Sequence, residues 1–140
     1  PENPVMEEVL TLAAARGAVM IAAAGNDGRE RAAYPAAHPD VIAVTAVDAA
    51  FRRYRAANFG DHIEFAAPGV DLYVAEGQGG SYASGTSYAA PIVTALAARL
   101  GAGGGLSVAA LRERMRSSAV DLGPSGFDAE YGWGLVRGGC

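Results

Sequence analysis

The sequence predicts an α/β fold in which helices flank a mostly parallel sheet. Two apolar runs, residues 18–24 and 41–47, continue without polar alternation, as strands buried on both faces of a parallel sheet do. Segments with helical apolar spacing precede the first run and follow the second. The 140 residues, of which 51% are hydrophobic, are enough for one domain with a core, so we expect residues 1–140 to lie in a single domain.

A helix is expected at the start of the chain. Asn3 is a favoured N-cap and Pro4 is a favoured first helical residue. Apolar residues between positions 5 and 13 recur at helical spacing. Gly17 then ends the helix, because glycine readily takes the left-handed conformation that follows many helices.

Three strands are expected next, over residues 18–24, 41–47 and 63–66. A polar loop separates the first two, and an arginine-rich connection separates the second from the third. In open parallel sheets, binding sites gather beyond the carboxyl ends of the strands. Asn26 follows the first strand directly, so it lies where a ligand would bind.

Glycines mark the boundaries of the remaining elements. We expect a small antiparallel ribbon, a helix that carries Ser87, a break at glycines 101–105, and a last helix capped by Ser107. A short extended segment closes the chain. The expected ranges are 70–75 and 81–83 for the ribbon arms, 77–80 for their turn, 87–100 for the first of these helices and 132–136 for the last segment.

Residues 85–91, Gly-Thr-Ser-Tyr-Ala-Ala-Pro, deliver Ser87 to the first turn of an apolar helix. A serine hydroxyl there stands clear of the helix, and the unpaired N–H groups of the helix start bind anions. An acyl-transfer enzyme needs both a nucleophilic oxygen and such donors. On its own, however, Gly-Thr-Ser before an apolar run more often marks ordinary helix capping.

Composition argues against several functions. The net charge of −4 does not suggest a nucleic-acid partner. The single cysteine, Cys140, allows no internal disulfide and no zinc-finger pattern. No apolar stretch reaches the length of a membrane span. The first residues lack the basic start of a signal peptide, which says nothing of export if the chain is a piece of a longer protein.

Four segments, in this order, resemble the subtilisin-like serine peptidases. Any one of them is a weak signal, whereas four in the family's order are specific. The resemblance covers nearly the whole chain and implies the C-terminal portion of that family's three-layer fold. Residues 1–140 would then be the C-terminal half of a peptidase domain that acts on peptides or proteins. The segments are 22–28 (AAAGNDG), 34–44 (from Tyr-Pro to Val-Ile-Ala-Val), 65–69 (FAAPG) and 85–91 (GTSYAAP).

The resemblance also implies roles for individual residues. Ser87 matches the nucleophile, and its backbone N–H matches one donor of the oxyanion hole. Asn26 matches the side chain that donates to the same oxyanion, although an isolated Asn before Asp-Gly is more often a turn residue. Small residues in the cleft imply an open, apolar specificity pocket. The substrate-binding residues implied are Ala23, Ala24, Gly25, Ala33, Gly85 and Thr86.

The general base of such an enzyme is missing from this sequence. The family places Asp, His and Ser in that chain order, and neither the Asp motif nor the His motif occurs here. His38 and His62 are expected at the surface. The chain alone is therefore predicted to be inactive. An N-terminal half would supply the base, or the chain would self-associate through the strand edge that the missing half leaves exposed.

Other interpretations remain open at this point. A non-catalytic peptide-binding or assembly domain of the same fold has the same motifs. A nucleotide-binding domain is disfavoured, because no Gly-x-Gly-x-x-Gly occurs. Calcium is common in the family, and Asp40 or Asp48 could contribute oxygens, but no dense run of ligands occurs, so no metal or cofactor is predicted. The family resemblance predicts a secreted or cell-envelope location.

Overall fold

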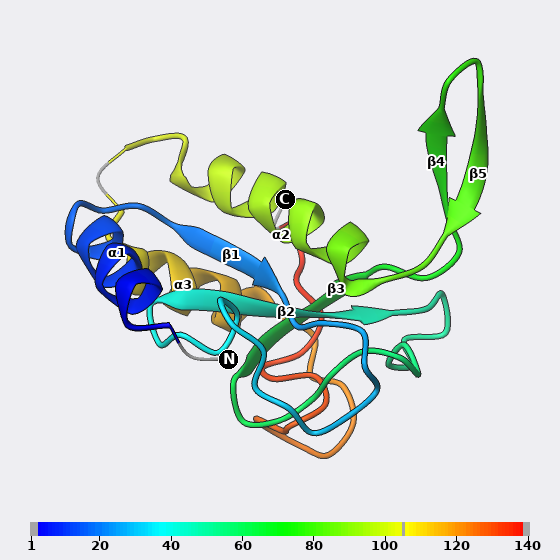
Figure 1. The fold of residues 1–140 in the computed structure, drawn as a ribbon, viewed down its shortest axis with the longest axis horizontal. Coiled ribbons are helices and arrows are strands. Elements are labelled where there is room, and N and C mark those ends of the chain that lie inside the picture. Colours follow the sequence, from blue (N-terminus) through cyan, green and yellow to red (C-terminus); the bar gives the residue numbers. More distant parts are fainter. Residues whose placement is uncertain (1–2, 105, 139–140) are drawn as a thin grey trace.

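The computed structural model describes residues 3–104 and 106–138, and three parallel strands form its central sheet (Figure 1). The order β1–β2–β3 follows the chain, and this parallel sheet with its helices confirms the α/β prediction. The second strand has the predicted bounds, whereas the third continues two residues further than expected. Gly105 and Cys140 lie outside the described residues. The strands are β1 (Met20–Ala23), β2 (Val41–Val47) and β3 (Ile63–Pro68).

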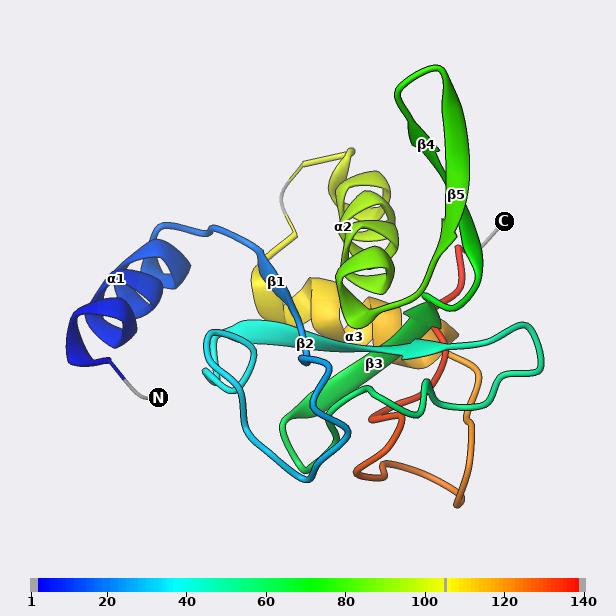
Figure 2. The same cartoon turned by 45° about the vertical axis from the view of Figure 1, so that its right-hand side comes forward.

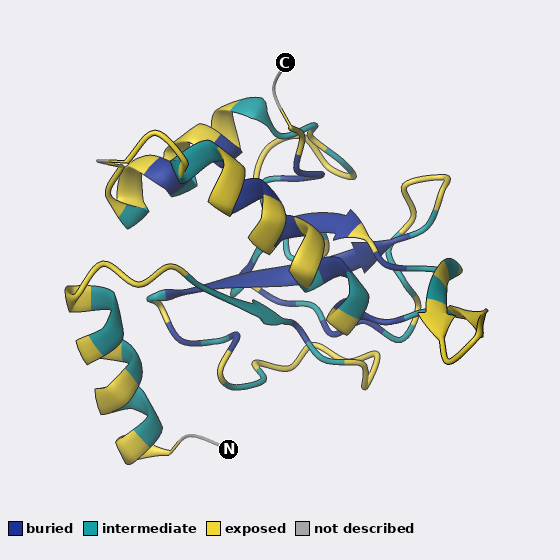
Figure 3. Ribbon diagram, turned by 90° about the horizontal axis from the view of Figure 1, so that it is seen from above, coloured by how far each residue is buried: buried dark blue, intermediate teal, exposed yellow. Residues whose placement is uncertain are grey.

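Two helices cover one face of the sheet. They are α2 (Thr86–Gly101) and α3 (Val108–Ser118), and both pack on β2 and β3 through the main hydrophobic core (Figure 3). Val93 of α2 and Met115 of α3 are fully buried there. The predicted cap of α3 is confirmed, because Ser107 Oγ accepts a hydrogen bond from the Ala110 N–H at 3.1 Å.

Loops cover the other face. Side chains of β2 alternate between the faces, so Ala43 and Val47 point toward the loops. The predicted closing segment, residues 132–136, runs beside β3 and extends the sheet. The Trp133 N–H donates to the Glu64 carbonyl at 2.8 Å, and the Val136 N–H donates to the Ala66 carbonyl at 2.9 Å.

The first helix, α1 (Pro4–Ala15), begins as predicted but does not join this core. Asn3 Oδ1 accepts hydrogen bonds from the N–H groups of Val5 (3.0 Å) and Met6 (3.3 Å). Yet no residue of α1 is buried, and Val5 is 71% exposed. Figure 2 shows α1 standing away from the sheet and from the other helices. Much of its apolar stripe, including Val5, Val9 and Leu12, is therefore exposed.

The predicted burial of the first strand on both faces is wrong. All four residues of β1 are only partly buried. The cause is topological: β1 pairs with β2 along one edge and, within the described residues, with no strand along the other. The first strand is thus an edge strand with free backbone groups.

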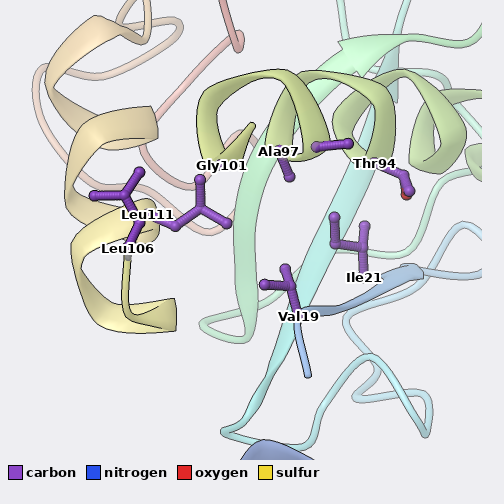
Figure 4. A pocket seen from close by; sticks show the side chains of 8 residues that line it. Val19, Ile21, Thr94, Ala97, Gly101, Leu106 and Leu111 are labelled. Atoms are coloured by element: carbon purple, nitrogen blue, oxygen red, sulfur yellow. The ribbon is translucent and has the colours of Figure 1, made fainter. Parts of the chain in front are cut away.

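A groove of about 340 Å³ lies beside this open strand, between β1, α2 and the start of α3 (Figure 4). Val19 and Leu106 are 41% and 39% exposed, which is high for large apolar side chains next to a core. The groove continues the uncovered strip of β1. Its lining includes Val19, Ile21, Thr94, Ala97, Leu106 and Leu111.

The predicted ribbon is a hairpin that projects from the body (Figures 1 and 2). It consists of β4 (Leu72–Glu76) and β5 (Gly79–Ala83), which are antiparallel. The turn is shorter than expected, because Gly79 and Gly80 pair within the hairpin and leave a two-residue turn. No helix in the described ranges has the length and apolar character to cross a membrane.

Candidate active site

The turn after β1 and the start of α2 meet at the carboxyl end of the sheet. Asn26 and Thr86 are sixty positions apart in the sequence but are joined directly. The Thr86 N–H donates to Asn26 Oδ1 at 3.0 Å, and the Thr86 hydroxyl donates to the same oxygen at 3.2 Å. Because Ser87 follows Thr86, the structure brings the side chain of Asn26 beside the turn that carries Ser87.

These contacts leave two N–H donors beside an exposed hydroxyl. With Oδ1 of Asn26 bound twice, Nδ2 is the free end of that amide, and no described residue accepts a hydrogen bond from it. The Ser87 N–H likewise has no described acceptor, as expected for the first turn of a helix. Ser87 itself is exposed. The arrangement can bind a negatively charged oxygen close to Ser87.

Small residues let the turn after β3 approach the start of α2. Gly69, directly after β3, accepts a hydrogen bond from the Gly85 N–H at 2.8 Å through its carbonyl. A Cβ atom at Gly69 would lie 2.7 Å from the Cβ of Ala46 and 2.9 Å from the Gly85 carbonyl oxygen. Only glycine therefore allows the start of α2 to sit this close to the end of β2.

The other residues implied by the family resemblance fall into two groups. Ala24, Gly85 and Thr86 are buried, and Ala23, Gly25 and Ala33 are partly buried. The polar groups of the buried set are used inside the fold: the Ala24 N–H donates to the Val44 carbonyl at 2.9 Å, and Thr86 holds Asn26. A substrate-binding role for all six stays a prediction.

The predicted exposure of the two histidines is wrong. His38 is only 5% exposed; its Nδ1 accepts from the Asp40 N–H at 3.1 Å, and its Nε2 lies 3.5 Å from Thr11 Oγ1. His62 is partly buried, and the resulting desolvation lowers its pKa from the ordinary value of 6.5. Both belong to loops that fold back on the sheet. Neither hydrogen-bonds to Ser87.

One buried polar residue near the site had no signal in the sequence. Asn58 lies between β2 and β3, and its side chain is fully buried. Its Oδ1 accepts a hydrogen bond from the Asp27 N–H at 2.9 Å, and its Nδ2 donates to the Ala24 carbonyl at 3.2 Å. Nothing in the run Ala-Ala-Asn-Phe-Gly distinguishes this Asn from a turn residue.

Within the described residues, no three His, Cys, Asp or Glu side chains are grouped so as to hold a metal ion. Asp48, one of the candidate calcium ligands, already has partners. Its Oδ1 accepts from the Ala50 and Arg52 N–H groups, and its Oδ2 accepts from Arg52 Nε at 2.8 Å. The backbone hydrogen bond from Arg52 is the main cause that lowers the pKa of this carboxyl. The expectation of no metal stays a prediction.

Comparisons with known proteins show which family and fold this chain resembles. The model of the subtilase family of peptidases matches residues 2–134. Over 97% of this chain, the sequence is 34% identical to the minor extracellular protease Epr of Bacillus subtilis (strain 168). Over 96% of this chain, it is 38% identical to subtilisin DY of Bacillus licheniformis. The solved structure of sphericase superposes with a TM-score of 0.90 at 30% identity, covering 98% of this chain.

The matches also show how much of each relative the chain represents. It covers 22% of Epr, 50% of subtilisin DY and 53% of the sphericase chain. It thus spans at most about half the length of these relatives, while nearly all of its own residues match. On the family match and the shared fold, the chain belongs to the subtilase family.

Proposed function

We propose that this chain is the nucleophile-bearing part of a serine endopeptidase that hydrolyses peptide bonds through an acyl-enzyme. The observation that carries the proposal is the pair of hydrogen bonds from Thr86 to Asn26 Oδ1. These bonds set the free amide of Asn26 beside Ser87 and its unpaired N–H. Membership of the subtilase family supports the same assignment.

In this proposal, Ser87 Oγ attacks the carbonyl carbon of the substrate, and the π electrons of the C=O bond move onto the oxygen. Asn26 Nδ2 and the Ser87 N–H donate hydrogen bonds to that oxyanion. The serine proton passes to a general base, which returns it to the leaving amine. Water then repeats the attack on the acyl-enzyme. Neutral amide donors stabilise the charge without reorganising during the reaction.

We infer that the base and its orienting carboxylate come from outside residues 1–140. Neither histidine of the chain hydrogen-bonds to Ser87: His38 accepts a hydrogen bond from the Asp40 N–H, and the His62 ring lies against Gly60 in its own loop. The open edge of β1 and the groove beside it supply a surface on which a further part of the domain would pack. By this account, the isolated chain is inactive.

The residues around Gly25 and the relatives of the chain bear on the substrate and on the location of the protein. We propose peptides or proteins as substrates, and the small residues Ala23, Gly25 and Ala33 favour an open, apolar pocket. Ala33 lies close to Gly25, since a Cβ placed on Gly25 would be 3.6 Å from the Cβ of Ala33. Because the similar protease Epr is described as extracellular, we propose that the protein containing this chain is secreted.

A fluorophosphonate probe, applied to the full-length protein that contains this chain, tests the proposal. We expect labelling that Ser87→Ala abolishes, because the probe reacts only with an activated serine. Ser125→Ala, which removes an exposed loop serine, is the matched control and should be labelled normally. Residues 1–140 alone should remain unlabelled. An intact protein that the probe does not label would favour a non-catalytic peptide-binding or assembly domain.

A further inference from the structure

Asn58 supports the turn that carries Asn26 and contacts it on both sides. Besides the side-chain hydrogen bonds to Asp27 and Ala24, the Asn58 main-chain N–H donates to the Gly25 carbonyl at 2.9 Å. These partners, residues 24, 25 and 27, lie on both sides of Asn26 in the chain. Among the described contacts, no hydrogen bond joins the side chains of Asn26 and Asn58, so Asn58 fixes the turn without holding the amide of Asn26 directly.

The side chain of Asn58 packs directly against Gly25, where there is no room for a Cβ atom. The Gly25 φ of +99° lies in the region that favours glycine, and a Cβ atom there would lie 2.5 Å from Asn58 Nδ2. The Gly25 N–H also donates to Thr86 Oγ1 at 3.2 Å. The turn is therefore held between a buried amide on one side and the start of α2 on the other.

The surroundings of Asn58 require an amide. Its side chain meets one N–H donor and one carbonyl acceptor, and an amide of this length supplies one acceptor and one donor together. A carboxylate would place a second oxygen against the Ala24 carbonyl. An apolar side chain would leave two backbone groups unpaired in a buried place. Either change would displace residues 24–27.

We propose that Asn58 is a positioning residue for the oxyanion site, because it holds the 24–27 turn so that Asn26 Nδ2 is aimed at the substrate oxygen. This inference rests on the proposed peptidase function. Donors stabilise a developing charge only when they are in place before the reaction, and a displacement of about 1 Å can cost about 10²-fold in rate. Asn58 acts through Asn26 and not on the substrate.

The test is a double-mutant cycle in the full-length protein, with kcat and KM measured on a peptide substrate. We expect Asn58→Ala to lower kcat by about 10-fold or more, with little change in KM. In the Asn26→Ala background, Asn58→Ala should change kcat by less than about 2-fold, because the donor that it positions is already absent. An equal loss in both backgrounds, as for a residue that only supports the fold, would overturn the proposal.

Two further variants keep the test decisive. Leu135→Val removes a buried methylene group from the cluster of Val47, Ala66 and Leu135, which includes no residue of the 24–27 turn, and should leave kcat unchanged. If Asn58→Ala does not fold, Asn58→Ser replaces it in the same cycle, because the shorter serine side chain loses the hydrogen bond to the Ala24 carbonyl. Equal losses of kcat with Asn26 present and with Asn26→Ala would again refute the role of Asn58. A normal kcat in Asn26→Ala would instead refute the oxyanion role of Asn26, whereas a full-length protein that does not hydrolyse peptides at all would refute the proposed function.

Discussion

Glu64 of β3 and Arg112 of α3 form a two-point ion pair, with 2.9 Å between Oε1 and Nη2 and 3.1 Å between Oε2 and Nε. Arg112 Nη2 also donates to the Pro39 carbonyl at 3.0 Å. Burial nevertheless raises the pKa of Glu64 above its ordinary value of 4.5, although the nearby guanidinium lowers it. Desolvation therefore outweighs the ion pair in setting the proton affinity of this carboxyl.

This relationship predicts a pH dependence of stability. Because the folded state holds the Glu64 proton more tightly than the unfolded state, the stabilising contribution is fully present below the unfolded-state pKa of 4.5. It is lost as the pH rises through the higher folded-state pKa. We expect Glu64→Gln to reduce this fall in the free energy of unfolding, as measured by urea unfolding across that pH range. An unchanged pH profile would contradict the prediction.

The charge of residue 26 predicts a second result. Asn26→Asp keeps an oxygen that can accept from Thr86 but replaces the donor by a carboxylate that repels the oxyanion. We expect kcat of the full-length protein to fall at least as far as in Asn26→Ala, for which a loss of about 10²–10³-fold, measured in a subtilisin, is carried over to this chain. Steady-state kinetics on a peptide substrate measures it. Asn3→Asp, at an exposed helix cap, is the control and should be neutral.

The close approach at Gly69 predicts a steric effect. Gly69→Ala would force a Cβ atom against Ala46 and the Gly85 carbonyl, and we expect it to lower stability by about 1–3 kcal/mol. Chemical denaturation measures the loss. Gly103→Ala, where a Cβ atom would meet open space, should change stability little. Equal effects at the two glycines would show that the loss at Gly69 is not steric.

The open edge of β1 predicts self-association of the isolated chain. Residues 1–140 should form dimers or larger species, because unpaired strand edges and exposed apolar side chains bind one another. Light scattering measures the mass. Val19→Lys, which places a charge on the groove beside β1, should shift the population toward monomer. A monomeric unmodified chain would contradict this prediction.

The sequence predicted the elements better than their surroundings. The runs at 18–24 and 41–47 are apolar enough to indicate strands in any context, and caps at Asn3 and Ser107 depend only on adjacent residues. Burial depends on partners far along the chain. For this reason the half-exposed state of β1 and the burial of His38 could not be read from local pattern.

For the candidate site too, the sequence predicted the local features but not the contacts between distant residues. Gly-Thr-Ser before an apolar run indicates a helix start that presents Ser87, but only the family resemblance paired Ser87 with Asn26. The supporting contacts of Thr86 and Asn58 arise from tertiary packing between turns distant in sequence. A single sequence carries no local signal for such contacts, because each residue type also occurs in ordinary turns and caps.

The hydrogen bond between Gly85 and Gly69 has a consequence for the hairpin of β4 and β5. The Gly85 N–H lies 2.8 Å from the Gly69 carbonyl oxygen where the chain enters and leaves the hairpin. A second hydrogen bond, from the Asp71 N–H to Ser84 Oγ at 2.9 Å, also joins the two sides of the hairpin base. The hairpin therefore projects from a base that these two hydrogen bonds close. We therefore expect that a segment of other length or sequence grafted there would leave Ser87 in place, which makes the hairpin a suitable position for a new recognition loop.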